Sequence, residues 1–209
     1  MESMVTKYYL TEWLFFRKKL LPIFIILSLL SILLTSLYYQ YYNDHPDRAK
    51  IMAPYYGKIP DKSIFLKVNK FTLIVRIFWN NLLITFGSAI SGLFPFLFLS
   101  GLTILGSSIA AGIALSHNEL FIKPDKFSLL MTVVPHGIFE MAAVIYASSI
   151  GIYLTIQTSK MIIPKFRPKA PSLQTLCEEA GRSFILIVVP LLAIAAFVEV
   201  LVTPKPFPH

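Results

Sequence analysis

The longest stretch without a charged side chain, Ile77–Asn118, constrains this sequence more than any other feature. As one α-helix it would be about 60 Å long, which is twice the ~30 Å thickness of the hydrocarbon core of a bilayer. The stretch must therefore fold back on itself as a hairpin of two membrane spans. Gly92 and Pro95 are the natural place for its turn, because glycine relaxes the backbone and proline suits the start of a helix.

The composition agrees with a membrane protein. Apolar residues make up 56% of the chain and charged residues 14%, whereas soluble domains carry about 25% charged residues. This balance excludes a water-soluble globular domain, a disordered chain and a nucleic-acid-binding protein. The net charge of +8 then points to lysine and arginine side chains beside anionic lipid. The single cysteine, Cys177, permits neither an internal disulfide nor a cluster of thiolate metal ligands.

Four apolar regions divide the chain into membrane spans and connections. We predict an all-α, polytopic transmembrane helical bundle with about five spans, forming a single integral membrane domain over residues 1–209. The predicted spans are 20–42, 73–93, 95–115, 127–157 and 183–203. Between the first two spans, the polar residues 43–72 predict a loop with an interfacial helix that begins near Asp61. Residues 159–182 predict a basic linker, in which Ser172 caps a short helix.

The fourth span contains an unusual interruption, Pro135 followed by His136 and Gly137. Proline removes a helical hydrogen bond and its ring clashes with the preceding turn, so this sequence predicts a kinked or broken helix. At the other end of the chain, the basic residues Arg17, Lys18 and Lys19 directly precede the first span. They predict a multi-pass protein of the cell membrane with its N-terminus in the cytoplasm.

Five polar side chains at predicted membrane depth are candidate functional residues: His136, Glu140, Glu199, Asn80 and Asn81. Ionisable groups at this depth are costly and usually face the interior of a bundle, where they mark function. His136 and Glu140 are four residues apart and share one helical face. Small residues at four-residue spacing predict close helix packing, within one bundle or in a homo-oligomer.

Three interpretations of this cluster stay open. The polar groups could form a buried His–Glu hydrogen bond that fixes helix register. They could instead bind a divalent metal such as zinc, with imidazole and carboxylate ligands and amide oxygens from the asparagines. In the third interpretation the cluster is a proton or solute pathway, as in a small ion- or proton-coupled transporter or channel. An enzyme is less favoured, because the zinc-protease pattern His-Glu-x-x-His is absent.

Several segments form a recognisable pattern: Phe78–Leu82, the glycine-spaced hairpin after it, Val134–Glu140, Ala180–Arg182 and Ala195–Glu199. Together they resemble the stage II sporulation protein M family of integral membrane proteins. The resemblance implies a polytopic protein with a cytoplasmic N-terminus that acts as a scaffold or assembly factor for other membrane or envelope proteins, not as an enzyme. The family's motif maps onto Asn80, Asn81, His136, Gly137, Glu140 and Glu199.

Overall fold

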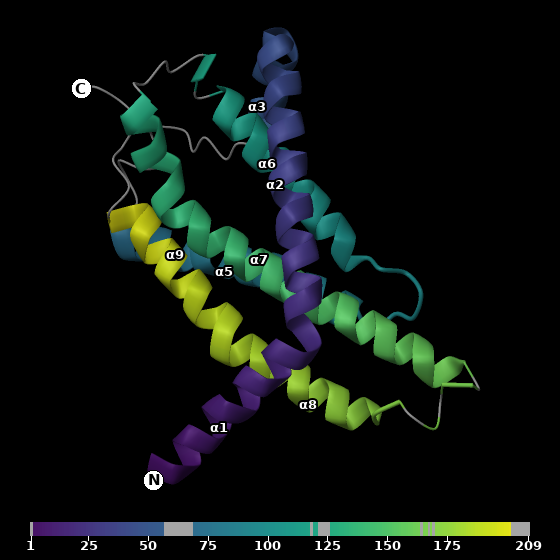
Figure 1. The fold of residues 1–209 in the computed structure, drawn as a ribbon. Coiled ribbons are helices and arrows are strands. Elements are labelled where there is room, and N and C mark those ends of the chain that lie inside the picture. The colour runs from purple at the N-terminus through teal and green to yellow at the C-terminus, as the bar shows by residue number, and fades with distance from the viewer. Residues whose placement is uncertain are drawn as a thin grey trace. The chain divides into compact units, whose positions relative to one another are not determined.

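The computed structural model of the chain describes residues 2–56, 69–117, 119–120, 126–163, 165–166, 168 and 170–201. These residues contain helices and no strand (Figure 1): α1 (Glu2–Phe15), η1 (Phe16–Leu20), α2 (Leu21–Asp44), α3 (Pro46–Tyr56), α5 (Lys70–Ser91), α6 (Ser100–His117), α7 (Lys126–Ile162), α8 (Leu173–Ser183), η4 (Phe184–Val188) and α9 (Val189–Leu201).

Five helical stretches are long and apolar enough to cross a membrane: Tyr9–Asp44, Lys70–Ser91, Ser100–His117, Pro135–Ile162 and Leu173–Leu201. The prediction of an all-helical, multi-pass membrane protein with five spans is therefore confirmed. Which side of the membrane holds the N-terminus stays a prediction. The chain divides into two compact units, one of residues 1–29, 83–104 and 143–190 and the other of residues 30–82, 105–142 and 191–209.

Small polar side chains join the helices of the first unit. The hydroxyls of Ser88 on α5 and Ser148 on α7 lie 2.9 Å apart, and both side chains are buried. Ser100, the first residue of α6, donates a hydrogen bond of 2.8 Å to the backbone oxygen of Ser88. Hydroxyls of this size satisfy each other without separating the helices, so the backbones can approach closely.

Two π-helical turns in the first unit each end shortly before a proline. The backbone N–H of Leu21 bonds to the carbonyl of Phe16, and that of Val189 bonds to the carbonyl of Phe184. Both bonds reach back five residues, one more than in an α-helix. In each case the next residue is a proline, whose ring would clash with the carbonyl four residues earlier. The wider turn makes room for the proline, so α1–α2 and α8–α9 each continue as one helical stretch.

The turn between α5 and α6 is longer than predicted. The third span was expected to begin at Pro95, but α6 begins at Ser100. Phe96 and Phe98 have positive φ angles of 66° and 43°, which no α-helix accommodates. The backbone N–H of Phe96 donates instead to the hydroxyl of Ser159, at 2.9 Å. A contact with a residue distant in the sequence therefore sets where this helix begins.

The proline in α7 does not break the helix. Residues Lys126–Ile162 form one helix with Pro135 inside it, so the broken helix that the sequence allowed at this position is absent. The helix also extends past the predicted end of the fourth span at residue 157, which shortens the predicted basic linker. Within that linker, the Ser172 hydroxyl accepts a hydrogen bond from the backbone N–H of Thr175. The predicted helix cap is therefore confirmed.

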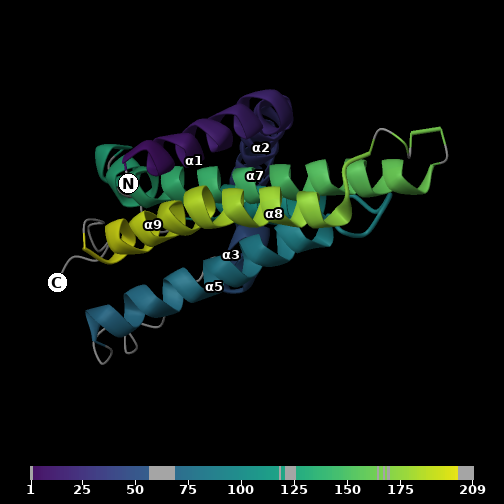
Figure 2. The same cartoon turned by 90° about the horizontal axis from the view of Figure 1, so that it is seen from below.

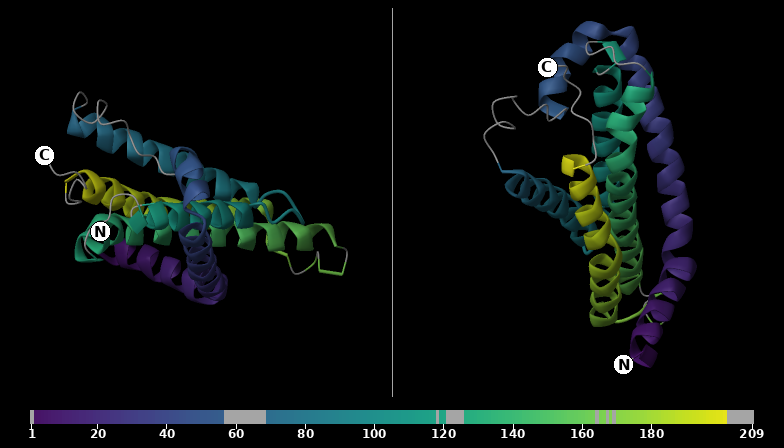
Figure 3. Two further views of the ribbon diagram at one scale, coloured as in Figure 1. Left: turned by 90° about the horizontal axis from the view of Figure 1, so that it is seen from above. Right: turned by 90° about the vertical axis from the view of Figure 1, so that its left-hand side faces the viewer.

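In the second unit, α3 occupies part of the predicted loop. Tyr42 and Ala49, on α2 and α3, form a buried apolar cluster with Ile113 on α6. The ribbons of these three helices meet at the top of the right-hand view in Figure 3. The Ser116 hydroxyl donates to the side-chain oxygen of Asn43, which ties the same helix ends together. The predicted start of an interfacial helix at Asp61 lies outside the described residues.

Candidate functional site

The five residues predicted from the sequence all lie in the second unit. Asn80 and Asn81 are on α5, and the side-chain nitrogen of Asn80 lies 3.4 Å from the side-chain oxygen of Asn81. His136 and Glu140 follow each other by one turn on α7, and Glu199 is on α9. Asn81 is buried and the other four are half-buried.

These residues do not form a recognisable metal centre. Within the described part of the chain, no group of three or more His, Cys, Asp or Glu side chains could hold a metal ion. Asn81, His136, Glu140 and Glu199 each interact with neighbouring groups. These four residues thus each have an interaction within the protein, and zinc at the five predicted residues stays a prediction.

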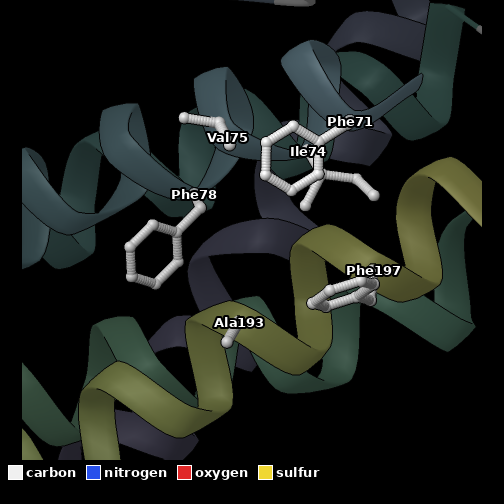
Figure 4. Close-up of a pocket in the computed structure, with 6 residues that line it drawn as sticks. All are labelled: Phe71, Ile74, Val75, Phe78, Ala193 and Phe197. Carbon is white, nitrogen blue, oxygen red and sulfur yellow. The ribbon is translucent and has the colours of Figure 1, made fainter. Parts of the chain in front are cut away.

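An apolar pocket lies between α5 and α9 in the same unit (Figure 4). Four α5 side chains and two α9 side chains line it: Phe71, Ile74, Val75, Phe78, Ala193 and Phe197. All six are hydrocarbon side chains, so the pocket offers no hydrogen-bonding or ionisable group. It suits an apolar ligand and does not provide a polar path.

The first unit contains a polar cluster that was not predicted, centred on Glu12 of α1. Only 4% of Glu12 is exposed. Its carboxylate accepts a hydrogen bond of 2.5 Å from the Ser183 hydroxyl and one of 3.3 Å from the Tyr146 hydroxyl. The Nε of Arg182 lies 3.3 Å from the other carboxylate oxygen. A buried carboxylate is thus bonded by a cation and two hydroxyls, as burial of a charge requires.

A second ion pair lies beside the first. The Nζ of Lys19 is 2.7 Å from both carboxylate oxygens of Glu179, and the Tyr153 hydroxyl donates to the same carboxylate at 3.3 Å. The same ammonium lies 5.3 Å from the ring centre of Phe15 and 5.6 Å from that of Tyr153, within range of cation–π attraction.

The two ion pairs form one arrangement, which we call the N-terminal clamp. Its members are Glu12, Tyr146, Arg182 and Ser183 in one layer and Lys19, Tyr153 and Glu179 in the other. The two residues from the N-terminal helix are seven apart, as are the two tyrosines of α7, so each pair shares a face two turns apart. The clamp holds α1 beside α8 and α7 (Figure 2).

The acid lies on the N-terminal segment in one layer of the clamp and on α8 in the other. Glu12 on α1 meets the cation Arg182, whereas Lys19 meets the anion Glu179 on the same helix, α8. Sliding α1 along α8 by one layer would therefore place like charges together, so the clamp specifies a single register. An acid and a base on each of the two segments, Glu12 with Lys19 and Glu179 with Arg182, were the available sequence signal. Their pairing depends on helices far apart in the chain.

The family model for stage II sporulation protein M matches residues 21–204. The chain belongs to the stage II sporulation protein M family. It is also 29% identical over 133 residues to an uncharacterized protein of Methanocaldococcus jannaschii, an alignment that covers 60% of this chain and 68% of the relative. No solved structure matches the chain.

Only some residues of the N-terminal clamp lie within the region that matches the family model. The clamp residues on α7 and α8 fall within the matched residues 21–204, whereas Glu12 and Lys19 precede them. In this member of the stage II sporulation protein M family, the matched region thus contacts a helix that precedes it in the chain.

Proposed function

We propose that this protein is a non-enzymatic membrane scaffold that uses the clamped N-terminal helix to position other membrane or envelope proteins. The clamp is the observation that carries the proposal. A helix held by two ion pairs and two tyrosines is a fixed element of the protein, since each contact restricts its rotation and sliding. A fixed helix can present a binding surface without the entropic cost of ordering a flexible segment on binding.

The surface that α1 presents supports this role. Tyr9, Leu10 and Trp13 are more than half exposed, whereas Glu12 is buried, so their side chains form the part of the helix surface that the clamp leaves open. Exposed Tyr and Trp side chains are the most frequent anchors of protein interfaces. The helical stretch Tyr9–Asp44 has 36 residues and spans about 54 Å, well beyond the ~30 Å hydrocarbon core. Part of it therefore reaches the interface, where neighbouring proteins can contact it.

The proposed partners include a second copy of the chain. The lipid-facing side of α2 exposes large apolar residues over several turns, including Ile26, Leu29 and Ile32. We expect lipid to cover this face of α2 and the second copy to dock on α1. Photocrosslinking distinguishes these occupants by the mass of what is captured.

Site-specific photocrosslinking in native membranes tests the proposal. A benzoylphenylalanine replaces Trp13 on the clamped helix or, as the matched control, Leu29 on the lipid-facing side of α2. The two positions are similarly exposed, at 56% and 64%. We expect protein adducts from position 13 and mainly lipid adducts from position 29, with the position-13 adducts lost in Arg182→Gln. Equal adducts at both positions, or none with protein at position 13, would contradict a scaffold that acts through α1.

Transport is the second candidate function, favoured by three half-buried ionisable residues on predicted spans. His136, Glu140 and Glu199 would relay a proton or bind a solute ion in this mechanism. Flux into liposomes that disappears in Glu140→Gln, but not in the exposed control Glu178→Gln, would establish transport. Absence of flux for every ion and solute tested leaves the scaffold as the better proposal.

Metal binding is a separate part of the proposal, with zinc as the expected ion at His136, Glu140 and Glu199 and at the amide oxygens of Asn80 and Asn81. Imidazole and carboxylate are suitable zinc ligands, which supports it chemically. Elemental analysis of protein purified without chelators decides the point. About one zinc per chain that is lost in His136→Ala would support the site, whereas substoichiometric metal unaffected by that change would remove it.

A further inference from the structure

The pocket between α5 and α9 has the composition and size of a site for hydrocarbon. Its volume is about 200 Å³, and every lining side chain is apolar. Enclosed cavities of about 150 Å³ with similar linings stay dry and accept benzene-sized molecules. Water gains no hydrogen bond in such a place, so an apolar group is the favoured occupant.

The lining residues follow a helical stripe, which gives the pocket a direction. Phe71, Ile74, Val75 and Phe78 recur at the spacing of one helix face, and they lie within the first nine residues of α5. Figure 4 shows Phe71 and Phe197 at one end of the pocket and Phe78 and Ala193 at the other. From Phe71 to Phe78 the helix rises by about 10 Å. The pocket therefore runs along the helices, as a lipid chain does.

The buried side chain of Ile74 and the short side chain of Ala193 form the floor of the pocket, and its outer residues are exposed. Ile74 is only 8% exposed, and the short side chain of Ala193 leaves the space between the two helices unfilled. Phe71 is 67% exposed and Phe197 is 49% exposed. In a multi-pass membrane protein, rings exposed on a transmembrane helix face the bilayer, so a lipid can enter from the side.

A lysine side chain, that of Lys70, lies next to the Phe71 end of the pocket. Lys70 is the first residue of α5, directly before Phe71, and it is exposed. The side-chain oxygen of Asn69 accepts a hydrogen bond from the backbone N–H of Phe71, which fixes the start of the helix. A long lysine side chain at a helix end reaches toward the headgroup region. A cation followed by an apolar pocket along the helix is complementary to an anionic phospholipid, whose charged headgroup is followed by hydrocarbon chains.

We propose that this pocket is a specific site for an anionic phospholipid of the bilayer, with a segment of one hydrocarbon chain between α5 and α9 and the phosphate at the Lys70 ammonium. The site is separate from the N-terminal clamp and does not depend on the proposed scaffold function. Lysine attracts the phosphate as a point charge, so charge and not headgroup shape selects the lipid.

Native mass spectrometry of delipidated protein in detergent tests the proposal. The probes are dioleoyl phosphatidylglycerol, which is anionic, and dioleoyl phosphatidylcholine, which is zwitterionic and has the same chains. We expect one phosphatidylglycerol per chain at a concentration at which phosphatidylcholine binds more weakly. No retained lipid, or equal binding of many copies of both, would overturn the proposal.

A pair of variants on α9 tests the pocket itself. Ala193→Phe places a ring in the pocket, and we expect both lipids to bind about tenfold more weakly, which corresponds to about 1.4 kcal/mol. The control Ile194→Phe adds a ring at the neighbouring position, which is 44% exposed and does not line the pocket. It should bind like the wild type. If Ala193→Phe does not fold, Ala193→Leu serves the same purpose, and wild-type binding by the folded variant would overturn the site.

A second pair of variants on α5 tests the cation. Lys70→Gln should remove the preference for phosphatidylglycerol while phosphatidylcholine binding stays unchanged. Arg76 is also exposed on α5, but at 100° per residue it lies on the side of the helix opposite the pocket. Arg76→Gln should therefore keep the preference. A preference that survives Lys70→Gln, or that falls equally in both variants, would contradict the assignment of the phosphate to Lys70.

Discussion

Gly92 and Gly151 touch through their backbones in the first unit. A Cβ atom at Gly92 would lie 2.7 Å from the Cα of Gly151, and one at Gly151 would lie 2.5 Å from the backbone oxygen of Ser88. Real Cβ atoms do not tolerate such contacts with backbone, so the turn after α5 can pack against α7 only because both positions are glycine. This contact continues the close approach that the Ser88–Ser148 hydrogen bond makes along the same helices.

The first prediction follows from this contact. Gly151→Ala should lower the free energy of unfolding by about 1–3 kcal/mol, the usual cost of overpacking. The matched control is Gly106→Ala in the interior of α6, where an added Cβ meets nothing within 4 Å. There the change should be neutral or slightly stabilising, because alanine favours helix. Thermal unfolding in detergent compares the two, and equal stability of both variants would show that the close contact is unimportant.

The second prediction concerns the unequal burial of the two ion pairs in the clamp. The Glu12 side chain is 5% exposed, so Arg182→Gln leaves a buried carboxylate without its cation and should cost about 3 kcal/mol. The Lys19 side chain is 37% exposed, and solvent screens its pair with Glu179, so Lys19→Gln should cost less than about 1 kcal/mol.

Glu178→Gln is the control for these changes. Glu178 is exposed on α8 and accepts a hydrogen bond from the side chain of Gln174, so its loss should change stability by less than about 0.5 kcal/mol. Denaturant unfolding of the three variants in one detergent gives the order. If Arg182→Gln costs no more than Glu178→Gln, the buried pair does not hold α1.

The third prediction concerns the tyrosines of α7. Tyr146→Phe removes the hydroxyl that bonds to Glu12 and Ser183 but keeps the ring, which stacks on Phe16 at 5.6 Å. The expected cost is about 1 kcal/mol. In a double-mutant cycle with Glu12→Gln the two changes should be non-additive by at least about 0.5 kcal/mol, since the groups share a hydrogen bond. Additive changes would show that the hydroxyl and the carboxylate act independently.

The helices themselves could be predicted from the sequence, because membrane spans follow from the length of apolar runs alone. The hairpin within Ile77–Asn118 was predicted only because one helix about 60 Å long does not fit a ~30 Å hydrocarbon core. The structure has two helices there, α5 and α6. The Ser172 cap was equally local, since a cap depends on the next three residues. Features set within one or two turns of the chain were thus accessible.

The clamp could not be predicted in the same way, because its partners are distant in the sequence. The bonds of Glu12 reach residues 134 and 171 positions away, so no local pattern connects them. The start of α6 was mispredicted for the same reason, since the bond from Phe96 to Ser159 spans 63 positions. Proline at position 95 suits a helix start, and only the tertiary contact shows that the helix begins five residues later.

The last prediction uses the strained backbone of that turn. Phe96 adopts a φ of 66°, a region in which a residue with a side chain is disfavoured by roughly 1–2 kcal/mol and glycine is not. Phe94 lies in the same turn, is similarly exposed at 56% against 54%, and is not among the residues with positive φ. Each change to glycine removes one phenyl ring of similar exposure, so the difference in stability between the two variants reports the backbone effect.

Phe96→Gly should therefore be more stable than Phe94→Gly by about 1 kcal/mol, because glycine relieves strain at position 96 and only adds flexibility at position 94. Thermal unfolding of the two variants under identical detergent conditions measures this difference. Ser159→Ala provides the companion test, since it removes the hydroxyl that the Phe96 N–H bonds to and should destabilise the turn without changing its apolar surface. If Phe94→Gly proves as stable as Phe96→Gly, the positive φ does not strain this turn, and the late start of α6 requires another cause.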